Sequence, residues 1–277
     1  MLIQITNRCR MGCQHCLDDS RPDGGMMSRD TLDCAVRFAL YCRTRHVVVS
    51  GGEPTEHPDL VEFCRRISDA GLSFSLCSNG MWIGDAEAER RVEEISGLAG
   101  YAGMQVYSNP KWYRLHGETV AKFKARQDKW RKLQIVLDTT EIRNMLSVGR
   151  AGQCAEAMAA AHASKYHNSC LAACITAVQS DSPAQFSELM TMQAHFCTPM
   201  VDWRGDVHMS ESWLCPSCGN VCRDDGERLW RGMRQFRPCG KCVGCRKYLS
   251  EDTPKMAMAR RLLGQDKETE QPEATNG

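Results

Sequence analysis

Short apolar segments alternate with amphipathic segments over the first two thirds of the chain. The apolar segments are rich in β-branched residues, and the intervening segments carry apolar residues at helical spacing. Such alternation is typical of parallel strands joined by helices, so we expect an α/β fold. The expected strands cover residues 2–6, 46–52, 72–80, 103–109, 133–138 and 170–181. The expected helices cover residues 28–45, 57–71, 85–100, 117–132, 152–164 and 182–195.

This pattern predicts a partial (β/α)6 TIM-type barrel over residues 1–195. In such folds the carboxyl ends of the strands meet on one face, and ligands bind there. Three motifs follow the first three expected strands, namely Cys9–Cys16, Gly51–Glu53 and Ser78–Asn79. We therefore expect these motifs to lie together on one rim of the sheet.

The cysteine content and the net charge indicate the compartment of the protein and limit its binding partners. The chain has 17 cysteines, no signal peptide and no apolar run of the roughly 20 residues that span a membrane. We expect a cytoplasmic protein whose clustered thiols bind metal, because disulfides rarely persist in that compartment. A net charge of +1 favours neither membrane nor nucleic acid. The basic, aromatic stretch 109–132 is interpreted as a solvated helix face rather than an RNA site.

Three cysteines, Cys9, Cys13 and Cys16, occupy one loop at C-x3-C-x2-C spacing. Thiolates are soft ligands that suit iron–sulfur clusters and zinc. A structural zinc site requires four ligands, whereas three thiolates on a 4Fe–4S cluster leave one iron open to a substrate or cofactor. The spacing favours the iron–sulfur cluster, and Gly12 permits the loop to curl around it.

These motifs, in this order, resemble those of the radical S-adenosylmethionine (SAM) superfamily. "SGGEPT" at Ser50–Thr55 is similar to the Gly-Gly-Glu-Pro element, "CSNG" at Cys77–Gly80 to a ribose- and carboxylate-binding element, and "SVGRA" at Ser147–Ala151 to a Gly-Arg-Ala segment. The resemblance covers about residues 1–181 and departs at His15, where many members have an aromatic residue. It implies that SAM is bound by His15, Gly51, Gly52, Glu53, Pro54, Ser78, Asn79, Ser108 and Arg150.

The resemblance also implies the chemistry. Cys9, Cys13 and Cys16 would hold a site-differentiated 4Fe–4S cluster whose fourth iron binds SAM. Reductive cleavage of SAM would yield a 5′-deoxyadenosyl radical that abstracts hydrogen from a substrate. An electron donor such as flavodoxin or ferredoxin would be a partner. We assign no catalytic side chain, because the reactive step belongs to the cofactor.

A second group of seven cysteines follows residue 196, where helical and strand periodicity fades. We expect a cysteine-rich domain over residues 196–250, similar to the SPASM and twitch extensions that hold auxiliary 4Fe–4S clusters. The paired C-x2-C spacing also fits a zinc ribbon, and one cluster, two clusters, or one cluster with zinc remain open. The segment 251–277 is expected to be a helix end and a disordered tail. The candidate ligands are Cys197, Cys215, Cys218, Cys222, Cys239, Cys242 and Cys245.

Three classes of function compete. The preferred interpretation is a radical SAM enzyme that modifies a peptide or protein side chain. The chain starts at the first expected strand, so we expect no leader-peptide-binding domain before it, which lowers this preference. The alternatives are a radical SAM enzyme acting on a small molecule, sugar or nucleotide, and a non-catalytic zinc-ribbon protein.

Overall fold

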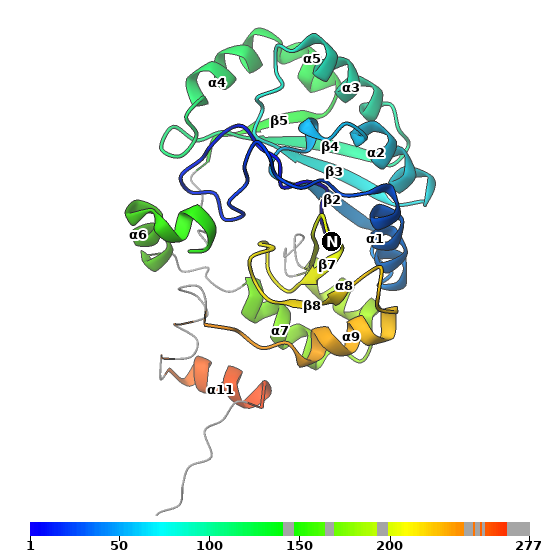
Figure 1. The fold of residues 1–277 in the computed structure, drawn as a ribbon, viewed down its shortest axis with the longest axis vertical. Coiled ribbons are helices and arrows are strands. Elements are labelled where there is room, and N and C mark those ends of the chain that lie inside the picture. Colours follow the sequence, from blue (N-terminus) through cyan, green and yellow to red (C-terminus); the bar gives the residue numbers. More distant parts are fainter. Residues whose placement is uncertain are drawn as a thin grey trace, which may run out of the picture.

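The computed structural model describes residues 1–140, 147–163, 169–192, 199–240, 246, 250 and 253–264. Within them, a single curved sheet carries helices on its outer side (Figure 1). The strands are β1 (Leu2–Gln4), β2 (His46–Ser50), β3 (Ser73–Ser78), β4 (Tyr101–Tyr107), β5 (Ile135–Asp138), β6 (Met200–Val201), β7 (Asp206–His208) and β8 (Ser217–Asn220).

The eight strands lie in the order β5-β4-β3-β2-β1-β6-β7-β8. Strands β1 to β5 pair in parallel, and β6 is parallel to β1 on its other side. The hairpin-like strands β7 and β8 extend the sheet in antiparallel fashion. The sheet is therefore an open, parallel-rich barrel segment, and the carboxyl ends of β1, β2 and β3 lie side by side.

The helices alternate with the strands in the first half of the chain and gather near the C-terminal strands in the second. The α-helices are α1 (Arg29–Tyr41), α2 (Leu60–Asp69), α3 (Ala86–Ser96), α4 (His116–Ala125), α5 (Gln127–Lys132), α6 (Ala155–Ala163), α7 (Ser169–Gln179), α8 (Pro183–Met192), α9 (Gly226–Gln235) and α11 (Pro254–Leu262). Two short 3-10 helices are η1 (Pro54–Glu56) and η2 (Gly149–Gln153).

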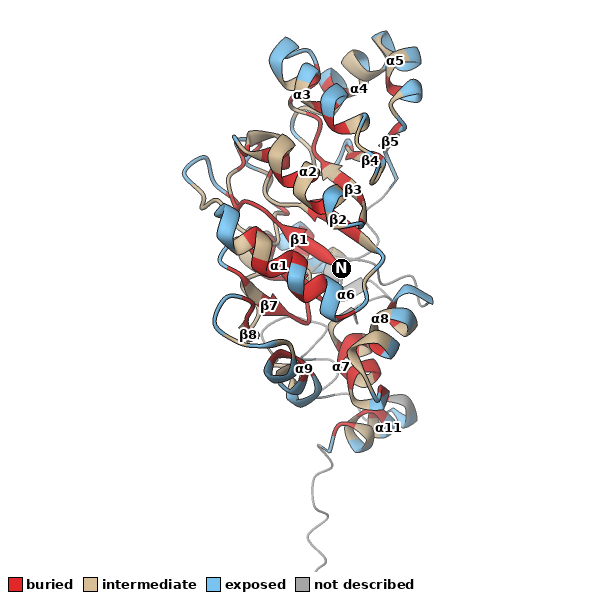
Figure 2. Ribbon diagram, turned by 90° about the vertical axis from the view of Figure 1, so that its right-hand side faces the viewer, coloured by how far each residue is buried: buried red, intermediate tan, exposed pale blue. Residues whose placement is uncertain are grey.

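The main core lies between the sheet and its outer helices. Along β3, Phe74 and Leu76 are fully buried against this layer, whereas the alternate residue Cys77 faces the inner side. Period-two alternation of this kind assigns one set of side chains to each face of a sheet. Figure 2 shows the buried band running through the strands and the inner faces of the helices. The inner face is thus left for polar and half-buried side chains.

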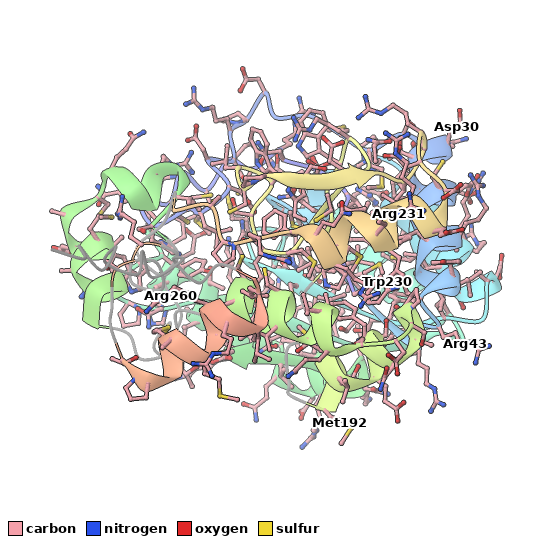
Figure 3. The ribbon with its side chains drawn as sticks, turned by 90° about the horizontal axis from the view of Figure 1, so that it is seen from below. Asp30, Arg43, Met192, Trp230, Arg231 and Arg260 are labelled. Carbon is pink, nitrogen blue, oxygen red and sulfur yellow. The ribbon has the colours of Figure 1, made fainter. Side chains whose placement is uncertain are left out.

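The helix α9 closes the C-terminal end of this core. Its residues Leu229, Trp230 and Met233 are buried, and the Trp230 ring packs on Phe186 of α8 with 5.7 Å between ring centroids. Trp230 is buried, whereas the Arg231 side chain is 64% exposed, and Figure 3 labels both residues on α9. The C-terminal region is therefore continuous with the barrel core through side-chain packing as well as through the sheet.

The expected strands before residue 140 are confirmed as β1 to β5, but the strand predicted at residues 170–181 is wrong. That segment forms α7, a helix from Ser169 to Gln179. Its buried residues include Leu171, Cys174 and Ala177 at three-residue spacing, which is the spacing of a helix face. The segment is a short apolar run that is rich in Ala and Cys. Its sequence therefore did not distinguish a strand from a helix. The sixth parallel strand is β6.

The region after residue 196 was expected to be a separate cysteine-rich domain. In the structure, β6, β7 and β8 of this region belong to the same hydrogen-bonded sheet as the barrel strands. The domain boundary remains a prediction, and the expected tail at 265–277 lies outside the described residues. Among the described helices, none is both long and apolar enough to cross a membrane.

Replacing Phe74 with alanine tests the core. Phe74 is fully buried and contacts Tyr101 in an edge-to-face pair with centroids 5.9 Å apart. We expect Phe74→Ala to lower the free energy of unfolding by about 3–5 kcal/mol, because transfer and cavity costs add. Urea denaturation followed by circular dichroism measures this. The control Val136→Ala, at a side chain that is 58% exposed, should change stability by less than about 0.5 kcal/mol. Equal effects in both variants would contradict the assigned core.

Candidate functional site

The cysteine loop follows β1, and backbone hydrogen bonds join its two ends before α1 begins. The Asn7 amide donates to the Gly25 carbonyl at 2.7 Å, and the Cys9 amide donates to the Arg21 carbonyl at 2.9 Å. Gly12 lies inside the loop with a φ of +67°, a conformation that glycine adopts without strain. Backbone pairing therefore closes residues 7–25 into one compact loop that holds all three thiols.

Two of the three thiols accept hydrogen bonds from nitrogen donors. The Cys9 Sγ accepts from the Met11 amide and from Asn79 Nδ2, each at 3.4 Å. The Cys16 Sγ accepts from the Ser20 amide, also at 3.4 Å. Donors that point at sulfur stabilise a thiolate and tune a bound iron–sulfur cluster. The donor set of the loop fits a cluster held by three thiolates.

Burial keeps the thiols of Cys9 and Cys13 protonated when no metal is bound. It raises the pKa of Cys9 to about 12 and that of Cys13 to about 11. A cluster must therefore displace protons when it binds, as metals generally do at thiol sites. Among the described residues, no three His, Cys, Asp or Glu side chains converge on a position for one metal ion. A 4Fe–4S cluster does not require that convergence, because each thiolate binds a different iron.

The Gly51–Gly52 pair brings the end of β2 against the start of the cysteine loop. The Gly52 amide donates to the Thr6 carbonyl at 2.8 Å. A Cβ on Gly52 would lie 2.3 Å from the Arg8 carbonyl oxygen and 2.9 Å from the Cys9 Cβ. Any other residue would push the loop away, so glycine is required here by close approach.

Glu53 is almost completely buried and joins β2 to β3 through its carboxylate. It accepts from the Ser78 hydroxyl at 3.0 Å, from the Asn79 amide at 2.8 Å and from the Thr55 hydroxyl at 2.7 Å. Burial raises the pKa of Glu53, and these donors oppose that rise. In this structure the carboxylate organises the rim, and Pro54 begins η1 directly after it. A contact of Glu53 with SAM remains a prediction.

Asn79 connects this carboxylate to the cluster loop. Its backbone amide donates to Glu53 and its side-chain amide donates to the Cys9 sulfur. The structure thus brings together the predicted residues of all three rim motifs. Ser108 lies one strand further along, where its hydroxyl is 3.0 Å from His116 Nδ1 and its amide donates to the Asp138 carbonyl.

His15 is buried among aromatic rings. Its ring centroid lies 5.5 Å from that of Trp112 and 5.0 Å from that of Tyr113. Burial lowers the pKa of His15 to about 4, so the imidazole is neutral near pH 7. Its Nδ1 has no hydrogen-bond partner among the described residues. Trp112 was not predicted as a site residue, because it lies in the basic, aromatic stretch 109–132 that was interpreted as a solvated helix face.

Arg150 holds the opposite side of the cysteine loop. Its guanidinium donates to the Cys13 carbonyl at 2.9 Å, to the Ser20 carbonyl at 2.8 Å and to Asp19 at 2.9 Å. Gly149, at a φ of +59°, lets the backbone approach, because a Cβ there would lie 2.8 Å from the Cys16 carbonyl oxygen. The structure therefore gives the predicted cofactor residue Arg150 a loop-holding role.

The C-terminal segment also contacts the cysteine loop. The Ser212 hydroxyl donates to the Leu17 carbonyl and Trp213 Nε1 donates to the Asp18 carbonyl, both at 2.9 Å. Figure 1 shows these two segments, far apart in the sequence, on the inner side of the sheet. Neither residue was predicted to belong to the site, because an isolated Ser-Trp pair in a sequence does not indicate a function.

The described C-terminal cysteines do not converge. Cys218 packs against the main core, Cys239 packs on Val148, and Cys222 interacts with Cys34 of α1. Cys215 is half-buried after β7, where its carbonyl accepts from His208. The remaining predicted ligands, Cys197, Cys242 and Cys245, lie outside the described residues. The auxiliary ligand set therefore remains a prediction.

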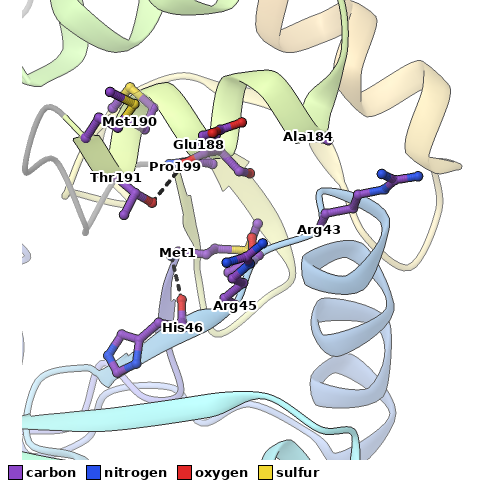
Figure 4. A pocket seen from close by; sticks show the side chains of 12 residues that line it. Met1, Arg43, Arg45, His46, Ala184, Glu188, Met190, Thr191 and Pro199 are labelled. Carbon is purple, nitrogen blue, oxygen red and sulfur yellow. Dashed lines mark hydrogen bonds between the residues drawn. The ribbon is translucent and has the colours of Figure 1, made fainter.

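One pocket lies at the rim, and another lies at the opposite ends of the strands. The first, of about 560 Å³, is lined by Arg8, Glu53 and Trp82, among others. The other, of about 410 Å³, lies between the starts of β1 and β2 and helix α8, where the Met1 amine donates to the His46 carbonyl at 3.1 Å (Figure 4). Because ligands of parallel sheets bind at the carboxyl ends of strands, the rim is the functional face.

The sequence model of the radical SAM superfamily matches residues 3–107, which contain the cysteine loop, the Gly-Gly-Glu-Pro segment and Ser78–Asn79. Residues 3–107 therefore match a radical SAM domain. Members of this family use a 4Fe–4S cluster and SAM as cofactors, and the donor set at Cys9, Cys13 and Cys16 fits such a cluster.

Curated relatives of the radical SAM domain differ in their named reactions. A PqqA peptide cyclase from Ruegeria pomeroyi is 33% identical over 91 residues, which is 32% of this chain and 24% of that protein. A probable GTP 3′,8-cyclase from Pyrococcus abyssi is 34% identical over 79 residues, which is 28% of this chain and 26% of that protein. The chain thus spans about a quarter of the length of these relatives.

Two solved structures share the fold of the radical SAM domain and of the C-terminal region. BtrN in complex with AdoMet and 2-DOIA has a TM-score of 0.53 at 13% identity, over 95% of this chain and 86% of that one. Streptococcus suis SuiB bound to the precursor peptide SuiA has a TM-score of 0.52 at 13% identity, over 91% of this chain and 73% of that one. At this identity the likeness concerns the fold alone.

Removing the Arg150 side chain should loosen the cysteine loop. We expect Arg150→Ala to raise the rate at which a reconstituted cluster loses iron to a chelator by about tenfold or more, as changes to groups that orient metal ligands do. The measurement is iron release followed by absorbance under anaerobic conditions. The matched control is Arg90→Ala, whose exposed guanidinium pairs only with glutamates of α3. Iron loss at the wild-type rate in Arg150→Ala would refute the loop-holding role.

Proposed function

We propose that the protein is a radical SAM enzyme that reductively cleaves SAM and abstracts hydrogen from a peptide or protein side chain. The observation that carries this proposal is the convergence of three rim motifs on Cys9. Gly52 lies against Cys9, and the Asn79 side chain donates a hydrogen bond to the Cys9 sulfur. The Glu53 carboxylate accepts from the Asn79 backbone amide and so positions Asn79. A cysteine cluster retained only for structure would not need this supporting rim.

The residues of the rim have separable tasks in the proposed reaction. Cys9, Cys13 and Cys16 would hold the cluster, which together with bound SAM supplies a 5′-deoxyadenosyl radical after one-electron reduction. Gly51 and Gly52 let the end of β2 lie directly against the loop, because no side chain intervenes. Neutral His15, with Trp112 and Tyr113, forms an apolar wall suited to an adenine ring. Such residues position the reactants and exclude water, while the cofactor performs the cleavage.

The substrate assignment rests on the relatives. The PqqA peptide cyclases match the radical SAM domain at 31–33% identity, which supports a peptide substrate. The alternative is a nucleotide, because GTP 3′,8-cyclases match at 32–34% identity over a similar length. An electron donor such as flavodoxin or ferredoxin would reduce the cluster. The seventeen cysteines support a reducing, cytoplasmic setting.

We also propose at least one auxiliary 4Fe–4S cluster in the C-terminal region. Seven cysteines occur between Cys197 and Cys245, which is more than a four-ligand zinc ribbon uses. Ser212 and Trp213, in the same region, hydrogen-bond to the loop of the first cluster. A cluster in this region would be suited to electron relay or substrate binding.

Cleavage of SAM tests the proposed activity directly. Anaerobically reconstituted protein with dithionite and SAM should produce 5′-deoxyadenosine and methionine, measured by chromatography with mass detection. Cys13→Ala should reduce this production to background because the cluster loses a ligand. The control variant Cys42→Ala, which changes a buried thiol just after α1, should retain 5′-deoxyadenosine production. Background production by the wild-type protein, with its cluster present, would refute the proposal.

The iron content of a variant without the first cluster tests the auxiliary cluster. We expect Cys9/Cys13/Cys16→Ala to keep about four irons and matching sulfide per chain, as a thiolate-held 4Fe–4S cluster requires. Elemental analysis and electron paramagnetic resonance provide the readout. Complete loss of iron together with about one bound zinc would replace the auxiliary cluster with a structural zinc site.

A further inference from the structure

The Asn79 side chain reaches the cysteine loop from a different strand of the sheet. Asn79 follows β3 directly and is only 8% exposed, whereas the loop follows β1. The sequence predicted Asn79 as a residue that binds SAM. In the structure, its side-chain amide donates to the Cys9 sulfur at 3.4 Å. This contact gives Asn79 a direct connection to a ligand of the cluster.

A second contact determines the orientation of the Asn79 side-chain amide. Asn79 Oδ1 accepts from the Met81 backbone amide at 2.9 Å, and a backbone N–H can only donate. The other terminal atom of the side chain, which faces the Cys9 sulfur, is therefore Nδ2. Because Nδ2 carries two N–H groups and does not accept, an N–H of Asn79 points at the sulfur.

The backbone around Asn79 is held by hydrogen bonds on both sides. The Asn79 amide donates to the Glu53 carboxylate at 2.8 Å. The Ser78 hydroxyl donates to the same carboxylate at 3.0 Å and accepts from the Gly80 amide, also at 3.0 Å. The main chain is thus fixed before and after Asn79, so its N–H donor has a defined position relative to the Cys9 sulfur.

Asn79 differs in kind from two other groups that donate to the loop thiols. The Met11 amide donates to Cys9 and the Ser20 amide to Cys16, and both belong to the backbone of the loop itself. Every residue other than proline would supply the same N–H at those two positions. At position 79 the donor belongs to the side chain, so it depends on the amino acid that occupies the position.

The surroundings of Cys9 otherwise disfavour negative charge on its sulfur. Burial is the largest cause of the raised pKa of Cys9, and the nearby Glu53 carboxylate raises this pKa further. Reduction of a 4Fe–4S cluster adds one negative charge, part of which falls on the ligand sulfurs. An N–H donor that faces such a sulfur therefore stabilises the reduced state of the cluster more than the oxidised state.

We propose that the Asn79 side chain raises the reduction potential of the cluster held by Cys9, Cys13 and Cys16. In the step concerned, an external reductant passes one electron to the oxidised cluster, and no bond to Asn79 forms or breaks. Asn79 acts through the Cys9 ligand, so it is a positioning residue and not a catalytic one. This inference rests on the proposed function, since it concerns the cluster that would cleave SAM.

The reduction potential of the first cluster tests this inference. Reconstituted wild-type and variant proteins are reduced stepwise with dithionite, without SAM, and followed by electron paramagnetic resonance. Signals that persist in Cys9/Cys13/Cys16→Ala belong to other clusters and are subtracted. Asn79→Leu replaces the amide with an apolar group of similar size. We expect it to lower the equilibrium constant for one-electron reduction about tenfold, which shifts the potential by ~59 mV to more negative values.

Two serine variants separate the N–H donor from a structural role. Asn79→Ser keeps an oxygen that can accept from the Met81 amide but is too short to reach the Cys9 sulfur. It should shift the potential as Asn79→Leu does, and it decides the inference if Asn79→Leu takes up less iron.

The matched control is Asn109→Ser, at a buried asparagine that follows β4 and is 5% exposed. Asn109 Oδ1 likewise accepts from the Lys111 amide at 2.8 Å, but its Nδ2 donates to the Thr140 carbonyl at 3.2 Å and not to a sulfur. This variant should leave the potential unchanged.

An unchanged potential in Asn79→Ser, or an equal shift in Asn109→Ser, would overturn the inference. Production of 5′-deoxyadenosine in the same preparations separates it from the proposed function. A shifted potential in Asn79→Ser, together with a wild-type protein that does not cleave SAM, supports the role of Asn79 and refutes the activity. SAM cleavage by the wild type, together with an unchanged potential in Asn79→Ser, refutes the role of Asn79 and supports the activity.

Discussion

The buried carboxylate of Glu53 is the contact on which the rim depends. It lies at the end of β2, accepts hydrogen bonds from the end of β3, and thereby positions Asn79, whose side chain donates to the Cys9 sulfur. Removing a carboxylate from water is unfavourable unless donors surround it, and here Ser78, Asn79 and Thr55 provide them. The two strand ends and the loop therefore form one hydrogen-bonded unit.

The cysteine loop is held from three directions. The ends of β2 and β3 hold its first cysteine, Arg150 holds the carbonyls at its far side, and the Ser212–Trp213 segment holds residues 17 and 18. A loop that must keep three thiols in position gains precision from such support.

The sequence predicted the first half of the fold well because its strands are short, β-branched and followed by turns. The prediction failed at α7, where residues 170–181 were assigned to a strand. In a short apolar run, Ala and Cys fit a strand or a helix equally well. The segment is a helix in the structure, where Leu171 and Cys174 pack against neighbouring helices. The sequence also did not show that β6 to β8 pair with the barrel strands, because hydrogen bonds between distant strands leave no local pattern.

The sequence alone identified the motifs of the rim, since the spacing of Cys9, Cys13 and Cys16 and the Gly-Gly-Glu-Pro segment are local patterns. Only the tertiary structure showed that Arg150 and Trp213 hold the cysteine loop. These residues come from distant parts of the chain. Their contacts could not be predicted from the sequence, because hydrogen-bonding interactions depend on distance and direction in space rather than on sequence spacing.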